Sequence, residues 1–356
     1  MTDPIRLAKP DVGDEELAAV AEVIATGQLT MGGKVEELER LLADTVGTAH
    51  AAAVSSGTAA LHVALLALGV GPGDEVIVPA YTFPATANAV RLCGGTPVLV
   101  DVDPDTFLAD IGAIAAAVTE RTKAVIAVHL FGRPLEWEAL QTAVPQEIPL
   151  VEDAAGALGA RYRGTPCGAL GVLACFSFHP RKIVTTGEGG AITTDEEKLD
   201  ASIRALRHHG WAAPGDMPQP GFNYRLPDLL CALGIPQLAR LEDLLRARER
   251  VAGWYTERLE SLVHVPRAGE GDRHGWQAYV VQLERRDEAL AGFREEGIEA
   301  QIGTWAVHRL DAYRGQGSFP GADRAFARAL ALPFSTTTTE AEVERVCQVL
   351  TRYVSE

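Results

Sequence analysis

The sequence predicts an α/β fold: a large domain with a seven-stranded, mainly parallel sheet covered by helices, followed by a smaller C-terminal α+β domain. Up to about residue 200, seven short apolar runs alternate with amphipathic helical stretches. Near-continuous apolar strands that alternate with helices are typical of parallel sheets covered on both faces. After Asn223 this alternation stops and a long helical stretch begins. A length of 356 residues agrees with two domains of ordinary size.

Each expected strand is a short run of apolar residues, and each expected helix between strands carries apolar residues at helical spacing. The expected strands are Ala51–Val54, Glu75–Val78, Pro97–Val100, Ala124–Val128, Leu150–Val151, Ala174–Phe178 and Ala191–Thr194. The expected helices are Ala59–Leu68, Ala85–Leu92, Ile111–Val118, Leu135–Ala143 and Glu196–His208.

The C-terminal part has a different pattern. Its expected elements are a nearly continuous helical stretch (Asp228–Glu260, punctuated by Pro227 and Pro236), a strand (Trp276–Leu283), a helix (Arg286–Glu296), a short strand (Glu299–Ile302), a glycine-rich loop (Arg314–Gly321) and a closing helix (Glu340–Val354). The threonine run Thr336–Thr339 is suited to cap that last helix. We place the domain boundary near Leu244, which divides the chain into residues 1–244 and 245–356.

Charge and cysteine content restrict the classes of function. The chain has 48 acidic and 32 basic residues, a formal net charge of −16, which disfavours binding to nucleic acid or to an anionic membrane surface. Five cysteines without a CxxC pair predict a reducing compartment and no structural zinc, and we expect no metal site. No signal peptide and no apolar run long enough to cross a bilayer is apparent, so we expect a cytoplasmic enzyme.

The segment Ser55–Leu61 reads SSGTAAL, and it follows a predicted strand and opens a helix. A helix N-terminus preceded by glycine and hydroxyl residues presents free backbone N–H groups and the positive end of the helix dipole, which suit a phosphate. The alternative is an ordinary serine or threonine helix cap.

A carboxylate, Asp153, follows directly on the predicted strand at Leu150–Val151. This places Asp153 at the carboxyl end of the sheet, where α/β folds bind ligands. A buried carboxylate needs a cationic partner, so a structural ion pair and a functional role both remain open.

The third segment, Phe176–Gly190, reads FSFHPRKIVTTGEGG. Lys182 lies between an apolar strand and a glycine-rich turn that would hold the lysine inward. A desolvated lysine loses its proton easily and becomes a nucleophile toward carbonyls. A phosphate cradle, an acid for a pyridinium nitrogen and a Schiff-base lysine are together what a pyridoxal 5'-phosphate (PLP) enzyme requires.

The motifs SSGTAAL, PAYTFPATANAV, VEDAAGALGA, FSFHPRKIVTTGEGGAITT and GFNYRLPDLLCALGIPQL resemble those of the DegT/DnrJ/EryC1/StrS sugar aminotransferases, which are PLP enzymes of fold type I. The resemblance implies that Lys182 forms the Schiff base and that Asp153 pairs with the pyridinium nitrogen. It also implies roles for the other expected cofactor contacts: Gly57, Thr58, Ala59 and Ser177 at the phosphate, Phe83 stacked on the ring, and Asn223 at the phosphate of the partner subunit's cofactor. A core phenylalanine is the alternative for Phe83.

Because the resemblance places Asn223 at the cofactor of the partner subunit, we expect a homodimer with shared active sites.

The same resemblance bears on the substrate. SFH followed by TTGEGG is similar to members that aminate C4 of a nucleotide-linked 4-keto-6-deoxyhexose, with L-glutamate as the usual amino donor. After Glu-Asp-Ala-Ala the family usually has Gln or His, whereas this chain has Gly156, so we expect open space beside the cofactor. Further candidates for substrate contact are His179, Arg181, Arg225, His308 and Tyr313; the last two lie in or near a segment similar to the family loop that closes over the substrate.

The sequence thus predicts a PLP-dependent aminotransferase that acts on a nucleotide-linked keto sugar. Gly156 keeps open a PLP enzyme of the same fold that acts on a keto-cyclitol or another non-sugar carbonyl. A non-catalytic PLP-binding regulatory protein is a further alternative, although such a protein would need neither Lys182 nor Asp153.

Overall fold

The computed structural model describes residues 4–354 and contains the predicted central sheet. Its strand order is β1-β10-β9-β6-β5-β2-β4. These are the seven predicted strands: β1 (His50–Val54), β2 (Glu75–Pro79), β4 (Thr96–Val100), β5 (Thr122–Val128), β6 (Leu150–Asp153), β9 (Leu173–Ser177) and β10 (Gly190–Thr194). Neighbours from β4 to β9 are parallel, and β10 is antiparallel to both of its neighbours. The prediction of a mainly parallel sheet is confirmed.

Helices cover both faces of this sheet, as its two-sided apolar strands require. The helices between strands are α3 (Gly57–Ala67), α4 (Ala85–Leu92), α5 (Ile111–Ala117), α6 (Trp137–Ala143) and α7 (Glu197–Arg207). Along β2, Val76 and Val78 belong to the apolar cluster under α3 and α4, whereas Ile77 belongs to the cluster with α5 and α6. The period-two alternation of a strand therefore feeds two separate cores.

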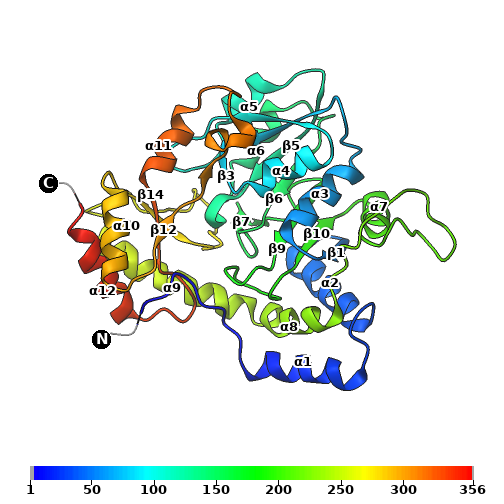
Figure 1. Ribbon diagram of the computed structural model, residues 1–356, viewed down its shortest axis with the longest axis horizontal. Coiled ribbons are helices and arrows are strands. Elements are labelled where there is room, and N and C mark those ends of the chain that lie inside the picture. The colour runs from blue at the N-terminus through cyan, green and yellow to red at the C-terminus, as the bar shows by residue number, and fades with distance from the viewer. Residues whose placement is uncertain (1–3, 355–356) are drawn as a thin grey trace.

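Two N-terminal helices were not predicted. They are α1 (Asp14–Thr26) and α2 (Gly33–Val46), and each ends at a glycine in the left-handed conformation, Gly27 and Gly47. Such glycines are typical helix stops, so the sequence carried the signal. Helix α1 lies along α8 at the edge of the molecule (Figure 1). The short elements η1 (Leu130–Gly132), β3 (Tyr81–Thr82), β7 (Arg161–Tyr162) and β8 (Thr165–Pro166) were also not predicted.

The C-terminal part adds a three-stranded antiparallel sheet of order β11-β14-β12. Its elements are α8 (Asp228–Ala239), α9 (Leu241–Leu259), β11 (Tyr279–Gln282), α10 (Arg286–Glu295), β12 (Gln301–Ile302), β13 (Trp305–Ala306), η2 (Val307–Arg309), η3 (Asp311–Tyr313), α11 (Pro320–Arg328), β14 (Ala329–Leu332) and α12 (Glu340–Thr351). Strand β14 and helix α11 were not predicted, and Pro236 lies within α8. Thr339 caps α12 as expected.

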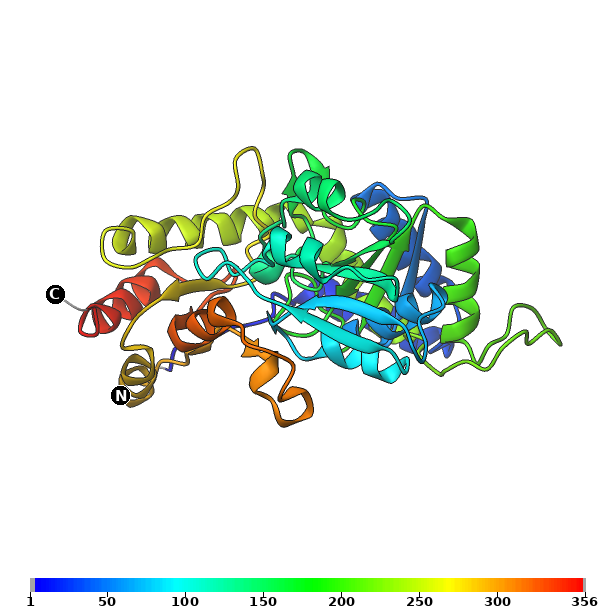
Figure 2. The same ribbon diagram turned by 90° about the horizontal axis from the view of Figure 1, so that it is seen from above.

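Helix α9 joins the two parts of the molecule (Figure 2). Leu244 and Leu245 pack in a cluster with β9 and α8, whereas the segment from Val251 to Leu259 packs with β11 and α12. A boundary at Leu244 stays a prediction. Ile5 lies in the C-terminal cluster, so the N-terminal end of the described chain packs with the C-terminal part. Within residues 4–354, no helix combines the length and the apolar character needed to cross a membrane.

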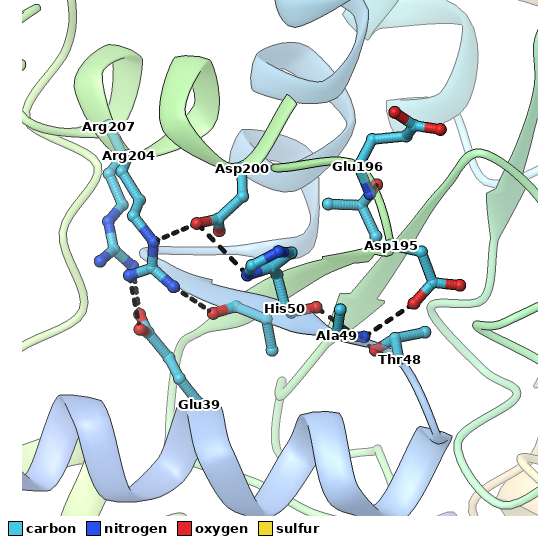
Figure 3. Close-up of polar contacts among 11 residues, drawn as sticks. Glu39, Thr48, Ala49, His50, Asp195, Glu196, Asp200, Arg204 and Arg207 are labelled. Atoms are coloured by element: carbon cyan, nitrogen blue, oxygen red, sulfur yellow. Dashed lines mark hydrogen bonds and ion pairs between the residues drawn. The ribbon is translucent and has the colours of Figure 1, made fainter. Parts of the chain in front are cut away.

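The outer edge of the central sheet, strand β1, is bound by charged side chains (Figure 3). Arg204 and Arg207 of α7 donate to the carbonyl oxygens of Ala51 and Ala53 at 2.8 and 2.6 Å. Glu39 of α2 accepts from the Ala53 N–H at 2.9 Å and pairs with both arginines. These contacts fix β1 at the point where it leads into the SSGTAAL segment.

Candidate active site

Three of the predicted site residues lie where β6 and β9 end, on adjacent parallel strands. Asp153 is the last residue of β6, Ser177 is the last residue of β9, and Lys182 follows five residues later. Since parallel strands end at the same edge, the topology brings the acid, the hydroxyl and the lysine to one edge of the sheet.

The predicted phosphate turn contacts Ser177. A Cβ atom at Gly57 would lie 2.9 Å from the Cβ of Ser177, so glycine is what allows α3 to approach β9 this closely. The first intrahelical bond runs from Ala60 N–H to the Ser56 carbonyl, which leaves the N–H groups of Gly57 and Thr58 directed outward. The Ser56 hydroxyl accepts from Ala59 N–H at 3.0 Å. Ser56 is thus a helix cap that engages the Ala59 N–H, whereas the N–H groups of Gly57 and Thr58 are available to a phosphate. The expected phosphate contacts of Gly57, Thr58 and Ala59 stay predictions.

Asp153 is 6% exposed, and its hydrogen-bond partners are neutral. The Thr86 hydroxyl lies 2.8 Å from Oδ2, and the Ala155 N–H donates to Oδ1 at 3.2 Å. Burial raises the pKa of Asp153, although these bonds and the positive charges of Lys182 and His129 act to lower it. A cationic group placed beside this carboxylate would restore its ionised form, as a protonated pyridine nitrogen does.

Lys182 is half-buried, and its backbone N–H donates to the His179 carbonyl at 2.8 Å. Burial lowers the pKa of the Lys182 amine to about 8; Arg248 and Arg181 lower it further, and Asp153 opposes the shift. A substantial fraction of the amine is therefore neutral near physiological pH, as a nucleophile or a base requires.

A buried network behind Asp153 was not predicted. Glu152 is 0% exposed and accepts four hydrogen bonds, from the N–H groups of Gly168, Leu170 and Gly171 and from His129 Nε2. The backbone N–H of His129 donates to the backbone carbonyl of Asp153 at 3.1 Å. Cys167 lies near His129 and Glu152, so these three side chains are close enough together to serve as metal ligands. However, both carboxylate oxygens of Glu152 already accept hydrogen bonds from N–H groups. The network fixes the ends of β5 and β6.

Thr86 was also missed as a site residue, although it lies within the quoted motif PAYTFPATANAV. It stands in the first turn of α4, three residues after Phe83. Phe83 is 63% exposed, so the alternative of a core phenylalanine is wrong. Its ring is free to contact a ligand, and stacking on the cofactor stays a prediction.

The expected open space at Gly156 is filled by another side chain. A Cβ atom at Gly156 would lie 3.1 Å from Cγ of Gln277. Gln277 comes from the segment before β11, and its Nε2 donates to the Arg181 carbonyl at 2.8 Å. The prediction of a cavity at Gly156 is therefore wrong. Gln277 was not foreseen as its occupant because the two residues lie far apart in the sequence.

The remaining candidates bind other parts of the chain. His179 Nδ1 accepts from Arg181 N–H at 3.2 Å, and burial lowers the pKa of His179. The Arg181 guanidinium donates to Gln301 of β12 at 2.8 Å. Arg225 donates to Asn223 Oδ1 at 2.9 Å, on a loop whose backbone pairs with the end of β1.

The segment expected to close over the substrate packs against β3 and α4. Strand β13 pairs with β3, directly before Phe83. His308 Nε2 lies 3.0 Å from Asp323 Oδ1, and Tyr313 is buried with its hydroxyl donating to Asn88 of α4. Direct contact of His308 or Tyr313 with substrate stays a prediction.

Comparison with known proteins assigns the class of this fold and site. A sequence profile of the DegT/DnrJ/EryC1/StrS aminotransferase family matches residues 10–351, and the chain belongs to this family. It is 40% identical over 365 residues to the GDP-perosamine synthase of Caulobacter vibrioides, with 97% of each chain covered. DesI, whose structure was determined in the presence of its TDP-sugar product, is 34% identical with a TM-score of 0.93, covering 99% of this chain and 93% of that one.

The cofactor of this family fits the residues present. Spr1654 of Streptococcus pneumoniae is 30% identical, with a TM-score of 0.94 over 98% of this chain and 97% of that one in its PMP form, and a PLP form is also known. In the present structure, helix N–H groups and a serine hydroxyl suit the phosphate, and a buried carboxylate without a cation in contact suits the ring nitrogen. The protein is a PLP-dependent aminotransferase, and the alternative of a non-catalytic PLP-binding protein is wrong.

The lowered pKa of Lys182 predicts a pH profile for cofactor attachment. Only the neutral amine attacks the aldehyde of PLP, so the rate should rise about tenfold per pH unit at low pH and level off above about pH 8. An ordinary lysine would instead keep gaining rate up to about pH 10.5. Stopped-flow absorbance of the apoprotein mixed with PLP measures the profile. A rate that still climbs tenfold between pH 9 and 10 would contradict a lowered pKa for the amine that attacks PLP.

Proposed function

We propose that this aminotransferase moves an amino group from L-glutamate to C4 of a nucleotide-linked 4-keto-6-deoxyhexose. The observation that carries the proposal is the match to GDP-perosamine synthase over 97% of both chains, with Lys182 and Asp153 at one edge of the sheet. DesI and its TDP-sugar product support the same substrate class. The keto-cyclitol alternative was motivated by open space at Gly156, and Gln277 fills that space.

The chain's own residues divide the work of the reaction. PLP, when bound, supplies an aldehyde that condenses with amines and a ring that spreads negative charge from the reacting carbon. The N–H groups of Gly57 and Thr58 and the Ser177 hydroxyl would hold the phosphate. Asp153 keeps a proton on the ring nitrogen, and Thr86 orients its carboxylate at 2.8 Å.

Lys182 moves the proton. With the cofactor bound, its Nζ would take a proton from the carbon that carries the donor's amino group and would return a proton to the cofactor, and a pKa of about 8 suits both roles. Over both halves, L-glutamate becomes 2-oxoglutarate, and the ketone of the sugar becomes an amine. The oxygen lost from the sugar equals the oxygen gained by the donor.

The test is turnover of GDP-linked and TDP-linked 4-keto-6-deoxyhexoses with ¹⁵N-labelled L-glutamate, with a keto-cyclitol as the control substrate. We expect ¹⁵N in the sugar product by mass spectrometry and its attachment at C4 by NMR. Turnover of the keto-cyclitol alone, or label at another carbon, would contradict the proposal.

We also infer that the protein acts in the cytoplasm. Its five cysteines are buried, free thiols, as expected in a reducing compartment. Burial raises the pKa of Cys93 to about 12, so this thiol is unreactive there.

We propose a homodimer with shared active sites. Large apolar side chains are exposed along α1 and the following loop, namely Leu17, Ile24, Leu29 and Met31. The segment 209–222 between α7 and α8 projects from the body in both views and carries exposed Trp211 and Met217 (Figures 1 and 2). Asn223 stands exposed at the base of that segment. Exposed apolar surface of this kind marks an interface with another chain.

Asn223→Ala should weaken cofactor retention about tenfold, because one hydrogen bond to a charged phosphate is lost. Equilibrium dialysis of PLP measures the change, and Gln348→Ala, on the exposed side of α12, is the control. A mixed dimer of Lys182→Ala and Asn223→Ala subunits should contain one intact site. A monomer in sedimentation that retains cofactor and turns over would contradict shared sites.

A further inference from the structure

The segment Gly275–Gln277 is inserted between two loops at the carboxyl edge of the central sheet. Gly275 N–H donates to the Gly132 carbonyl at 2.7 Å, and Gln277 N–H donates to the Phe131 carbonyl at 2.9 Å. Residues 131 and 132 follow β5, and Gly156 follows β6. The inserted segment therefore lies beside the strand end that carries Asp153.

Two glycines make this insertion possible. A Cβ atom at Gly132 would lie 2.8 Å from the Trp276 nitrogen, and a Cβ at Gly156 would lie 3.1 Å from Cγ of Gln277. The first distance is impossible for a real side chain, and the second is tighter than ordinary van der Waals contact. Trp276 itself adopts a φ of +47°, which bulky residues rarely adopt without support from their surroundings.

Arg248 of α9 supplies that support. It is 4% exposed, and its guanidinium donates to the carbonyl oxygens of Trp276 and Gln277 at 2.8 and 3.3 Å. Arg248 pairs with no carboxylate among residues 4–354, so its hydrogen bonds go to this turn. His274 accepts from Trp276 N–H at 2.8 Å and stacks on its ring, which fixes the turn from the other side.

The Gln277 side chain reaches from this fixed turn to the lysine segment. Its Nε2 donates to the carbonyl of Arg181, the residue before Lys182, at 2.8 Å. Its Oε1 accepts no hydrogen bond from any residue of the described chain, and the side chain is partly exposed. A rigidly held amide thus presents a free acceptor between the Asp153 and Lys182 segments.

We propose that Gln277 is a specificity residue that accepts a hydrogen bond from a hydroxyl of the keto sugar next to the reacting carbonyl. The inference rests on the proposed function. A sugar hydroxyl can donate to Oε1, whereas the carboxylates of L-glutamate are acceptors only and gain nothing from it. Gln277 should therefore favour the sugar half of the reaction over the donor half.

Gln277→Met tests the proposal, because methionine keeps the bulk beside Gly156 and removes the amide. Single-turnover stopped-flow measures each half-reaction separately, with Gln348→Met as the surface control. We expect kcat/KM for the keto sugar to fall roughly 10-fold, while the L-glutamate half stays within about 2-fold. In calorimetry, the apoprotein should bind the nucleotide-linked amino sugar more weakly and the free nucleoside diphosphate unchanged.

A second variant, Gly156→Ala, displaces Gln277 without removing it and should shift the same two measurements in the same direction by less. Equal losses in both half-reactions would show that Gln277 only holds the Lys182 segment, and no loss in either would show that it is not used; both results overturn the proposal. Wild-type failure with every nucleotide sugar would remove the proposed function and this inference together. Wild-type turnover with an unaffected Gln277→Met enzyme would remove the inference alone.

Discussion

Lys182→Ala should reduce transamination by at least about a thousandfold, because it removes both the nucleophile that holds the cofactor and the base that moves the proton. Nothing else in the described active site is placed to replace it: His179 Nδ1 already accepts from Arg181 N–H and burial lowers the pKa of His179, while the Arg181 guanidinium donates to Gln301. Coupled assay of 2-oxoglutarate release measures the loss. Borohydride reduction followed by mass spectrometry measures covalent attachment of cofactor, which should disappear.

Lys198→Ala on the exposed side of α7 is the matched control, and it should retain full activity and attachment. If borohydride still fixed the cofactor to the Lys182→Ala chain at one specific residue, another lysine would be the attachment site.

Asp153→Asn should lower kcat by roughly 100-fold to 1,000-fold, since the positive charge on the ring nitrogen loses its buried counter-charge. Folding should be preserved. The hydrogen-bond partners of Asp153 are a hydroxyl and an N–H, and an asparagine can keep at least one of them. Absorbance of the bound cofactor and steady-state kinetics report the catalytic effect.

The pKa of Asp153 also gives a sign for stability. Burial raises this pKa in the folded apoprotein, so the folded state binds the proton more tightly than the unfolded chain and loses that stability as pH rises. At neutral pH, apo Asp153→Asn should be no less stable than the wild type in thermal unfolding. Asp243→Asn, on the exposed face of α9, is the control. A well-folded Asp153→Asn enzyme with full activity would assign the pairing with the ring nitrogen to a different residue.

The sequence was a good guide to the central sheet because each strand is a local apolar run. All seven runs pair in one sheet, and the errors at their ends are one or two residues. Helix α1 keeps apolar residues such as Leu17 exposed, which blurs the one-sided pattern expected of a packed helix. Helix α2 buries Leu38 and Leu42 on one face, so its sequence carried a pattern that was missed.

The site divides in the same way. Lys182, Asp153, Ser177 and Gly57 were found because they lie in short motifs, and the structure places them around the ends of β6 and β9. Thr86 contacts Asp153 from helix α4 and His129 from the end of β5, and contacts over such sequence distances leave no local pattern. Gly156 shows most clearly what a local motif cannot predict. The space beside this glycine is filled by Gln277, which lies 121 positions further along the sequence.

Strand β1 has a consequence for how molecules of this enzyme meet. Its outward backbone groups at Ala51 and Ala53 are already occupied by Arg204, Arg207 and Glu39, which take the place that an eighth strand would hold. A neighbouring molecule therefore cannot add a strand here without first displacing two guanidinium groups. The charged border therefore protects this edge of the sheet from the strand-by-strand addition that leads to open-ended fibres.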